Sequence, residues 1–222
     1  MAVNKESYQL IKSELNAKGI TLVAVSKTKP IEDIKELYDL GQRDFGENYV
    51  QELTDKAGQL PQDIRWHFIG HLQGNKVRFI APFVQLIHGV DSLKLLKEIN
   101  KQAEKNNRVI DCLLQVHIAK EETKFGLDEG ELNELINQLT NQPLNNVRIC
   151  GLMGMASFTD NMDLVRNEFQ NLKTIFDRLT THDSRLTTLS MGMSSDYKIA
   201  IAEGSTMIRI GSLLFGERVK TS

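Results

Sequence analysis

Lys27 stands just after a short apolar run, and its position suits chemistry on an aldehyde. Side chains alternate along a strand, so Lys27 shares one face with Val23 and Val25. A lysine at the end of a buried face is partly desolvated and deprotonates more readily, and the neutral amine can form a Schiff base. Lys29 has the same parity, but it precedes Pro30, which favours an extended turn leading away from the strand. An ordinary solvated loop lysine is the alternative, and position alone does not separate the two.

Arg209 is a second residue whose type and spacing indicate a site. Met207 and Arg209 share one face of a predicted strand, and Ile208 and Ile210 share the other. The isoleucines suit packing against helices, so Arg209 is expected to point to the same side of the fold as Lys27. A buried arginine is almost never left unpaired. Its partner is either an ion-pairing residue inside the fold or a bound ligand, and the sequence leaves both open.

Two turns near the C-terminus suit a phosphate group. Ser194, Ser195 and Asp196 follow a glycine turn after a predicted strand and begin a helix. Unpaired backbone N–H groups and the helix dipole favour an anion at such a position. Gly211 and Ser212 follow the last predicted strand in a similar way. N-capping of the helix is the alternative role for the serines, and Asp196 is expected to be a cap or a first-turn charge.

The hydrophobic pattern predicts a scaffold in which these strand ends meet. The strand candidates are residues 21–26, 43–45, 66–69, 86–90, 109–117, 147–153, 187–191 and 207–210. Helices are predicted near residues 31–40, 48–58, 73–80, 92–106, 128–140, 161–180 and 195–203. This alternation predicts an α/β fold, a single-domain (β/α)8 TIM barrel over residues 1–222 with an extra N-terminal helix; a doubly wound open sheet is the competing architecture. In such barrels, the C-terminal strand ends carry the chemistry and the last two loops bind phosphate.

Composition and spacing exclude several functions. The 222 residues carry a formal charge of −2 without a long block of one sign, so nucleic acid and anionic membranes are not expected partners. No apolar stretch approaches the ~20 residues of a membrane span, and the N-terminus lacks a signal-peptide core. Cys112 and Cys150 lie in separate apolar runs, which is typical of reduced core cysteines in a cytoplasmic protein. His67 and His71 are four residues apart but lack a further ligand, so no metal site is predicted.

Five segments carry a resemblance to a known family: VAVSKTKP, DFGENYVQE, WHFIGHLQGNK, GLMGMAS and LSMGMSSDYKIAIAEGSTMIRIGSLLFGER. From about residue 20 to residue 218 the chain resembles the pyridoxal phosphate homeostasis proteins, also described as proline synthetase co-transcribed homologues. That family is similar to the barrel domain of alanine racemases, which are fold-type III pyridoxal 5'-phosphate (PLP) proteins. The resemblance implies that Lys27 forms a Schiff base with PLP and that Arg209 faces the pyridine nitrogen. It further implies phosphate contacts from Ser194, Ser195, Gly211 and Ser212, and positions near the ring for Asn48, His71 and Met153.

The resemblance implies a PLP-binding protein that acts in intracellular PLP homeostasis without robust catalysis. Arginine only donates hydrogen bonds, so Arg209 would keep the pyridine nitrogen unprotonated and the cofactor a weaker electron sink. Alanine racemases carry a further β-domain with a catalytic tyrosine, for which this sequence is expected to leave no room. The alternative is a racemase or related enzyme of low activity that uses Tyr49 or His71 as its second base. The expected partners are PLP and PLP-dependent apoenzymes. The protein is expected to be a monomer. The loop residue Lys124 has no assigned role.

Overall fold

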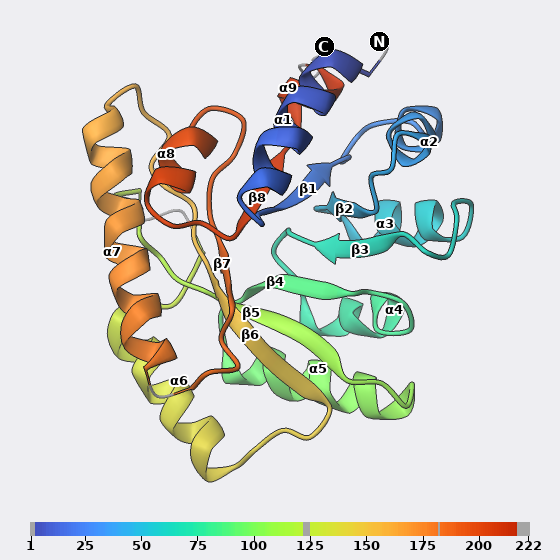
Figure 1. The fold of residues 1–222 in the computed structure, drawn as a ribbon. Helices are drawn as coiled ribbons and strands as arrows, with labels where there is room; N and C mark the ends of the chain where they lie inside the picture. Colours follow the sequence, from blue (N-terminus) through green and yellow to red (C-terminus); the bar gives the residue numbers. More distant parts are fainter. Residues whose placement is uncertain (1–2, 122–124, 182, 217–222) are drawn as a thin grey trace.

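Eight parallel strands close into a barrel in chain order, with β1 hydrogen-bonded to both β2 and β8 (Figure 1). The computed structural model describes residues 3–121, 125–181 and 183–216. The strands are β1 (Thr21–Val25), β2 (Asp44–Glu47), β3 (Arg65–Phe68), β4 (Leu86–Val90), β5 (Ile110–Gln115), β6 (Val147–Met153), β7 (Thr188–Ser190) and β8 (Met207–Ile210). Each of them overlaps one predicted strand. The barrel is therefore confirmed, and the open sheet is excluded.

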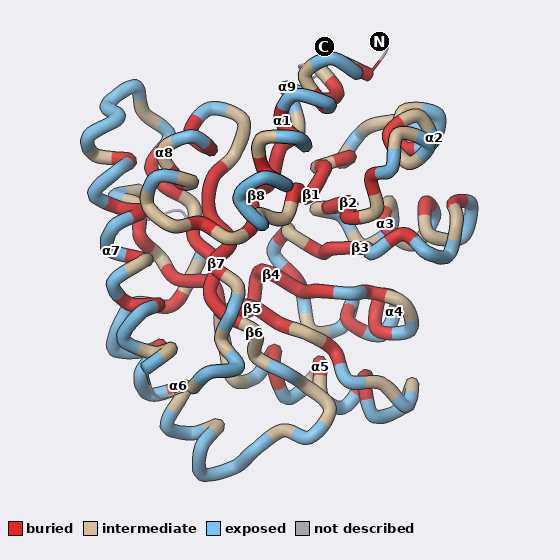
Figure 2. The backbone as a smooth tube through the Cα atoms, in the orientation of Figure 1, coloured by how far each residue is buried: buried red, intermediate tan, exposed pale blue. Residues whose placement is uncertain are grey.

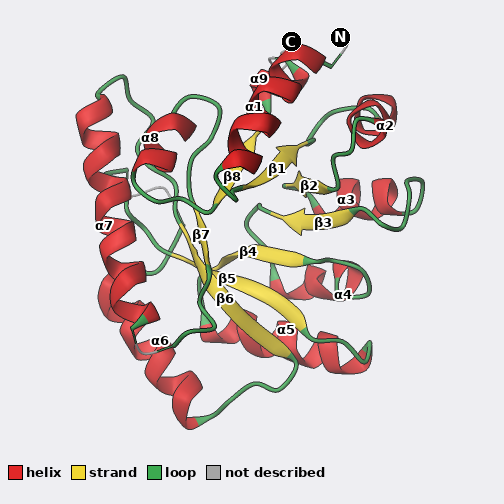
Figure 3. Ribbon diagram, viewed as in Figure 1, coloured by secondary structure: helices red, strands yellow, loops and turns green. Residues whose placement is uncertain are grey.

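Helices lie outside the barrel, the first before β1, the last after β8 and the others between successive strands (Figure 3). They are α1 (Lys5–Ala17), α2 (Ile31–Asp39), α3 (Val50–Ala57), α4 (Val77–Ile80), α5 (Leu93–Lys105), α6 (Glu129–Asn141), α7 (Met162–Thr180), α8 (Tyr197–Ala202) and α9 (Ser212–Phe215). The predicted helix at 73–80 is a 3-10 turn, η1 (Gly74–Lys76), followed by α4. The sequence analysis did not predict α9, because four residues are too few to show helical periodicity.

Side-chain caps begin three of the crossover helices, and at the start of α7 the Asn161 side chain accepts the N–H of Leu164. The Ser92 hydroxyl accepts the N–H of Leu95 at the start of α5. Asp128 and Glu131 form a reciprocal capping box at the start of α6. Asp196 precedes α8 but does not cap it with its side chain, because its Oδ1 turns back and accepts the N–H of Met193 at 2.5 Å. Asp196 thus occupies the N-cap position of α8 without a side-chain capping bond.

Apolar side chains pack in two separate layers. The buried residues concentrate along the strands of the barrel (Figure 2). The larger layer fills the space between strands and helices, and it includes Ile208 and Ile210. The smaller one lies inside the barrel and consists of Val23, Leu86, Leu113, Met153 and Met207. The alternation along β8 is thus as predicted, with the isoleucines facing the helices and the Met207 face turned inward.

The N-terminal helix α1 packs beside α9, so the two ends of the described chain meet (Figure 1). Its apolar face buries Tyr8, Ile11 and Leu15, and the N–H of Asn4 donates to the carbonyl of Leu214 at 2.8 Å. This confirms the extra N-terminal helix. It also places α1 against the segment that follows β8, where a phosphate contact was predicted.

Three further features bear on the predicted function class. Cys112 is buried, Cys150 is half-buried, and both are free thiols. Among the residues that the structure describes, no helix is both long and apolar enough to cross a membrane. The same residues contain no cluster of three or more histidine, cysteine, aspartate or glutamate side chains suited to a metal ion.

Candidate functional site

Lys27 lies in the loop after β1, and both of its neighbours are held by carboxylates. Ser26 is buried and donates its hydroxyl to Glu47 Oε1 at 2.6 Å. The backbone N–H of Thr28 donates to Glu52 Oε1 at 2.6 Å, and Thr28 has a φ of 63°. A threonine in the left-handed region is uncommon and requires support from its surroundings. The half-buried Lys27 therefore sits on a loop whose path is fixed on both sides.

Lys56 binds these two carboxylates together beneath the loop. Its amino group lies 2.8 Å from Glu47 Oε1, 2.6 Å from Glu52 Oε1 and 2.8 Å from the carbonyl oxygen of Ser26. Burial raises the pKa of Glu47, and the charge of Lys56 offsets part of that rise. The second oxygen of Glu47 has no hydrogen-bond partner in the described part of the chain. This buried cluster holds the loop in place and commits Lys56 to a structural role.

Lys29 turns away from the barrel mouth. Its amino group donates to the carbonyl oxygens of Phe215 at 2.7 Å and Gly216 at 3.2 Å, at the end of α9. The left-handed turn at Thr28 breaks the strand alternation, so equal parity no longer places Lys27 and Lys29 on one face. Lys29 therefore ties the β1 loop to α9.

Arg209 lies inside the barrel on β8, and its side chain is buried. It donates to the carbonyl of Ser190 at 2.9 Å, to the Ser190 hydroxyl at 2.7 Å and to the carbonyl of Gly154 at 3.2 Å. No described carboxylate forms a direct ion pair with it. Burial lowers the pKa of Arg209 to about 10, against the opposing charge of Asp196, so it stays protonated at neutral pH. The sequence left open an ion pair between Arg209 and a residue inside the barrel, and no such direct ion pair is present among the described residues.

The strand register places Lys27 and Arg209 at one end of the barrel but at different depths. Val23 pairs with Arg209 across the β1–β8 ladder, and Lys27 follows Val23 by four residues. Val23 itself faces the interior. Lys27 therefore lies nearer the C-terminal mouth, and Arg209 lies deeper.

The two predicted phosphate segments meet at the same end. The N–H of Gly211 donates to the Ser194 hydroxyl at 3.3 Å, which joins the loop after β7 to the loop after β8. In the described structure, the backbone N–H groups of Ser194, Ser195 and Ser212 donate to no protein acceptor. Gly192 permits this loop path, because it has a φ of 97° and an added Cβ would lie 2.5 Å from the Cβ of Ala200. The segments thus offer several backbone donors to an anion.

The three residues predicted near the ring occupy different environments. Met153, at the end of β6, is buried in the interior apolar layer. Asn48 follows β2, and its buried Oδ1 has no partner in the described residues. His71 is 42% exposed; it stacks on Phe125 with ring centroids 4.0 Å apart, and its Nδ1 lies 3.6 Å from Asp91 Oδ2. Met153 and Asn48 suit a bound ring, whereas His71 is an exposed loop residue. Lys124 lies outside the described residues.

Several residues around this site were missed by the sequence analysis. Glu47 and Lys56 support the Lys27 loop, and Ser190 holds Arg209. Ser190 in turn contacts His88, with its hydroxyl 3.2 Å from His88 Nδ1. The sequence hinted at these two residues only weakly, because each is a polar residue inside a short apolar strand. One polar residue in such a strand faces either the interior or a helix, and sequence alone does not say which.

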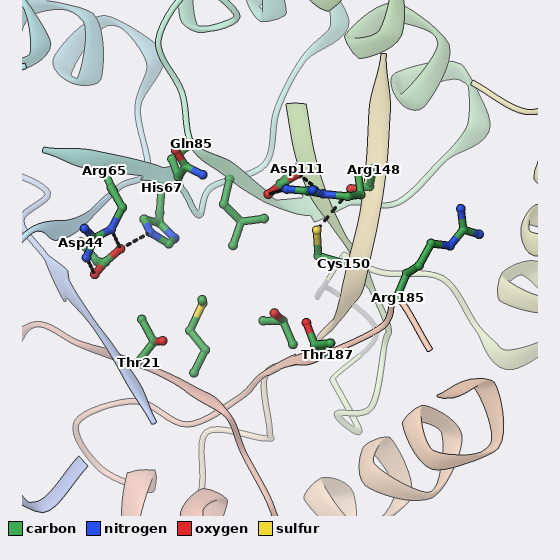
Figure 4. Close-up of a pocket in the computed structure, with 13 residues that line it drawn as sticks. Thr21, Asp44, Arg65, His67, Gln85, Asp111, Arg148, Cys150, Arg185 and Thr187 are labelled. Carbon is green, nitrogen blue, oxygen red and sulfur yellow. Dashed lines mark hydrogen bonds and ion pairs between the residues drawn. The ribbon is translucent and has the colours of Figure 1, made fainter. Parts of the chain in front are cut away.

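A cavity of about 540 Å³ opens at the other end of the barrel (Figure 4). Its lining includes the first residues of several strands, among them Thr21, Asp44 and Arg65. The predicted site residues lie at the opposite, C-terminal strand ends. Because barrel chemistry is carried by the C-terminal loops, we place the candidate site there and not in this cavity.

Comparison with known proteins assigns the family. Residues 5–219 match the model of the alanine racemase N-terminal domain. The pyridoxal phosphate homeostasis protein of Aquifex aeolicus is 45% identical over 199 residues, covering 89% of this chain and 86% of that protein. The chain belongs to the pyridoxal phosphate homeostasis protein family. The family member from Escherichia coli K12 is 39% identical over 203 residues, with 90% and 86% of the two chains covered.

Solved structures agree with this family. PipY of Synechococcus elongatus PCC7942, a structure with PLP bound, is 38% identical with a TM-score of 0.87, covering 95% of this chain and 99% of that one. An alanine racemase from Clostridium difficile 630 has a TM-score of 0.76 at 14% identity. It covers 98% of this chain but only 60% of the racemase. The racemase likeness therefore concerns the barrel fold alone.

Proposed function

We propose that this chain binds PLP through a Schiff base on Lys27 and acts in intracellular PLP homeostasis, without robust catalysis of its own. The observation that carries the proposal is the buried Arg209, which has no direct carboxylate partner in the described residues. Its remaining N–H groups suit an acceptor such as a pyridine nitrogen. The relatives named for PLP homeostasis and the PLP-bound PipY structure support the same ligand.

The described residues fit a phosphorylated pyridine aldehyde at three points. A lysine stands at the mouth, an arginine lies deeper in the barrel, and the backbone donors of the Ser194 and Ser212 segments lie at the same end. Met153 and the unsatisfied Asn48 Oδ1 offer one apolar and one polar contact for a ring. The aldehyde would join Lys27, and the phosphate would lie on the donors after β7 and β8.

An arginine beside the pyridine nitrogen suits a carrier better than a racemase. When bound, PLP supplies an electron sink for carbanions, and it does so best when its ring nitrogen is protonated. Arg209 has a pKa of about 10 and donates, so it competes with that protonation. This site would therefore hold the cofactor while stabilising a carbanion poorly.

A racemase or related enzyme of low activity is the second candidate. The exposed rings of Tyr49 and His71 are the observation that favours it, because a second base needs access to a substrate. For the carrier, we propose that PLP-dependent apoenzymes receive the cofactor. We also propose that the chain is a single domain and a monomer, and that it is cytoplasmic, where its free cysteines would stay reduced.

Absorption and racemisation measurements test the proposal. Protein loaded with PLP and freed of excess cofactor is expected to show a visible Schiff-base band, which Lys27→Ala removes and Lys29→Ala retains. The same holoprotein, mixed with single enantiomers of amino acids, is expected to leave them unchanged. Racemisation at ordinary enzyme rates that is lost in Lys27→Ala would overturn the carrier and support the enzyme.

A further inference from the structure

A chain of hydrogen bonds crosses the barrel interior from Arg209 to Asp44. Arg209 lies 2.7 Å from the Ser190 hydroxyl, and that hydroxyl lies 3.2 Å from His88 Nδ1. His88 Nε2 lies 2.9 Å from His67 Nδ1, and His67 Nε2 lies 3.1 Å from Asp44 Oδ1. All five side chains are buried. They come from β8, β7, β4, β3 and β2, so the chain connects strands on different sides of the barrel.

Donor and acceptor chemistry gives this chain one direction. A guanidinium only donates, so the Ser190 oxygen accepts from Arg209; when His88 Nδ1 carries no proton, the Ser190 hydroxyl donates to it. A neutral His88 then carries its proton on Nε2 and donates it to His67 Nδ1. His67 in turn donates from Nε2 to Asp44, whose carboxylate only accepts. With both imidazoles neutral, every atom in the chain has a matching partner.

A protonated imidazole fits this interior less well. It would add a second positive charge to a barrel that already contains Arg209, and it would make His88 donate to Ser190. The Ser190 hydroxyl proton would then have no acceptor in the described structure. Burial, together with the positive charge of Arg209, lowers the pKa of His88 well below its ordinary value. The neutral, single-direction arrangement is therefore favoured.

Asp44 lies at the wall of the cavity at the N-terminal strand ends (Figure 4). Arg65 donates hydrogen bonds to both carboxylate oxygens of Asp44, at 2.7 and 2.5 Å, and half of the Arg65 side chain is exposed. The matching pair Asp111 and Arg148 lines the same cavity, with both contacts at 2.7 Å. Of these two carboxylates, Asp44 contacts a histidine, His67, and Asp111 contacts none among the described residues. The two pairs therefore differ in their connection to the interior chain.

We propose that Asp44, His67, His88 and Ser190 are positioning residues for Arg209. The chain gives the buried guanidinium a counter-charge from the opposite end of the barrel and determines which of its N–H groups stay available. The effect of the chain on the cofactor nitrogen rests on the proposed function, because the N–H groups of Arg209 that stay available are the ones that would face PLP. Together with the charge of Asp196, which acts on Arg209 without direct contact, the chain helps to keep Arg209 charged in the interior.

The histidine rings test the chain without any cofactor. Nitrogen-15 NMR of the apoprotein at neutral pH is expected to show His67 and His88 as neutral Nε2–H tautomers with slowly exchanging ring protons. An Nδ1–H tautomer or a doubly protonated ring at either position overturns the proposed direction. This result does not depend on PLP binding, so it remains decisive if the proposed function fails.

Two variants at opposite ends of the chain test its effect on the cofactor. Asp44→Asn and Ser190→Ala are each expected to shift the pH midpoint of the absorption change of bound PLP by about one unit in the same direction. Asp111→Asn, which removes the matching carboxylate outside the chain, is the control and is expected to leave the midpoint in place. Equal midpoints in Asp44→Asn and Asp111→Asn, with PLP bound in both, would overturn the positioning role.

Discussion

The amino group of Lys29 lies 2.7 Å from the carbonyl oxygen of Phe215. This contact distinguishes Lys29 from Lys27, although strand alternation alone places both on the same face. Lys27 and Lys29 have the same parity after β1. The turn at Thr28 and the bonds of Lys29 to the end of α9 give them different directions. Lys29 is thus a link between two loops of the barrel, and the cofactor lysine we propose is Lys27.

Lys29→Met is expected to weaken the attachment of α9 while leaving the Schiff base intact. The change leaves the carbonyls of Phe215 and Gly216 without this donor, at a cost of roughly 1–3 kcal/mol. Thermal unfolding measures the loss, and Lys94→Met on the exposed face of α5 is the control. A Lys29→Met protein that melts like the control would contradict the link.

Lys56→Met is expected to destabilise the protein strongly. It leaves the buried Glu47 without its cation, and removal of one partner from a buried pair costs about 3–5 kcal/mol. The exposed pair Lys173–Asp177 offers a matched control, because Lys173→Met should cost less than about 1 kcal/mol. Denaturant unfolding of both variants makes the comparison, and equal losses would mean that the Lys56 cluster does not support the loop.

The stability of the fold is expected to fall at acidic pH through Asp44. Burial alone would raise the pKa of Asp44, but hydrogen bonds from His67 and Arg65 outweigh it and lower the pKa from 3.8 to about 2. A carboxyl with a lowered folded pKa stabilises the fold above its unfolded pKa and loses that contribution as the pH falls. The contribution at neutral pH is about 2 kcal/mol.

Asp44→Asn should therefore remove part of the acid dependence. Between about pH 5 and pH 2, the free energy of unfolding of the variant should fall less steeply than that of the parent protein. Urea unfolding at a series of pH values measures the two slopes. Parallel slopes would show that Asp44 ionises in the fold as it does in the unfolded chain.

Gly192→Ala is expected to disturb the loop that presents Ser194. Both Gly192 and Gly41 have positive φ values, 97° and 95°, so an alanine at either one costs about 1–2 kcal/mol. At Gly192 the new methyl also lies 2.5 Å from Ala200, whereas nothing lies within 4 Å at Gly41. Only Gly192→Ala should weaken the retention of PLP, which equilibrium dialysis measures. Equal retention in both variants would argue against a phosphate contact from this loop.

The barrel and the direction of Arg209 could be predicted from sequence, because both depend on local alternation. Ile208 and Ile210 face the helices while Met207 and Arg209 face the interior, as period two requires. The separation of Lys27 from Lys29 could not be predicted in this way. It depends on a left-handed residue at Thr28 and on α9, which is too short to show a period.

The hydrogen-bond chain that ends at Arg209 could not be predicted either. His88 lies on β4 and Ser190 on β7, strands that are not neighbours in the sheet, and closure of the barrel brings His88 Nδ1 within 3.2 Å of the Ser190 hydroxyl. Contacts of this kind depend on register between distant segments, which a single sequence does not contain.

Peptide mapping after borohydride reduction determines whether Lys27 holds the cofactor. The protein is loaded with PLP, reduced, digested and analysed by mass spectrometry, with Lys27→Ala treated in parallel. We expect one pyridoxyl phosphate group per chain, attached to Lys27 and absent from the variant. An adduct on Lys29 or Lys56, or no adduct in a protein that has retained PLP, would contradict it.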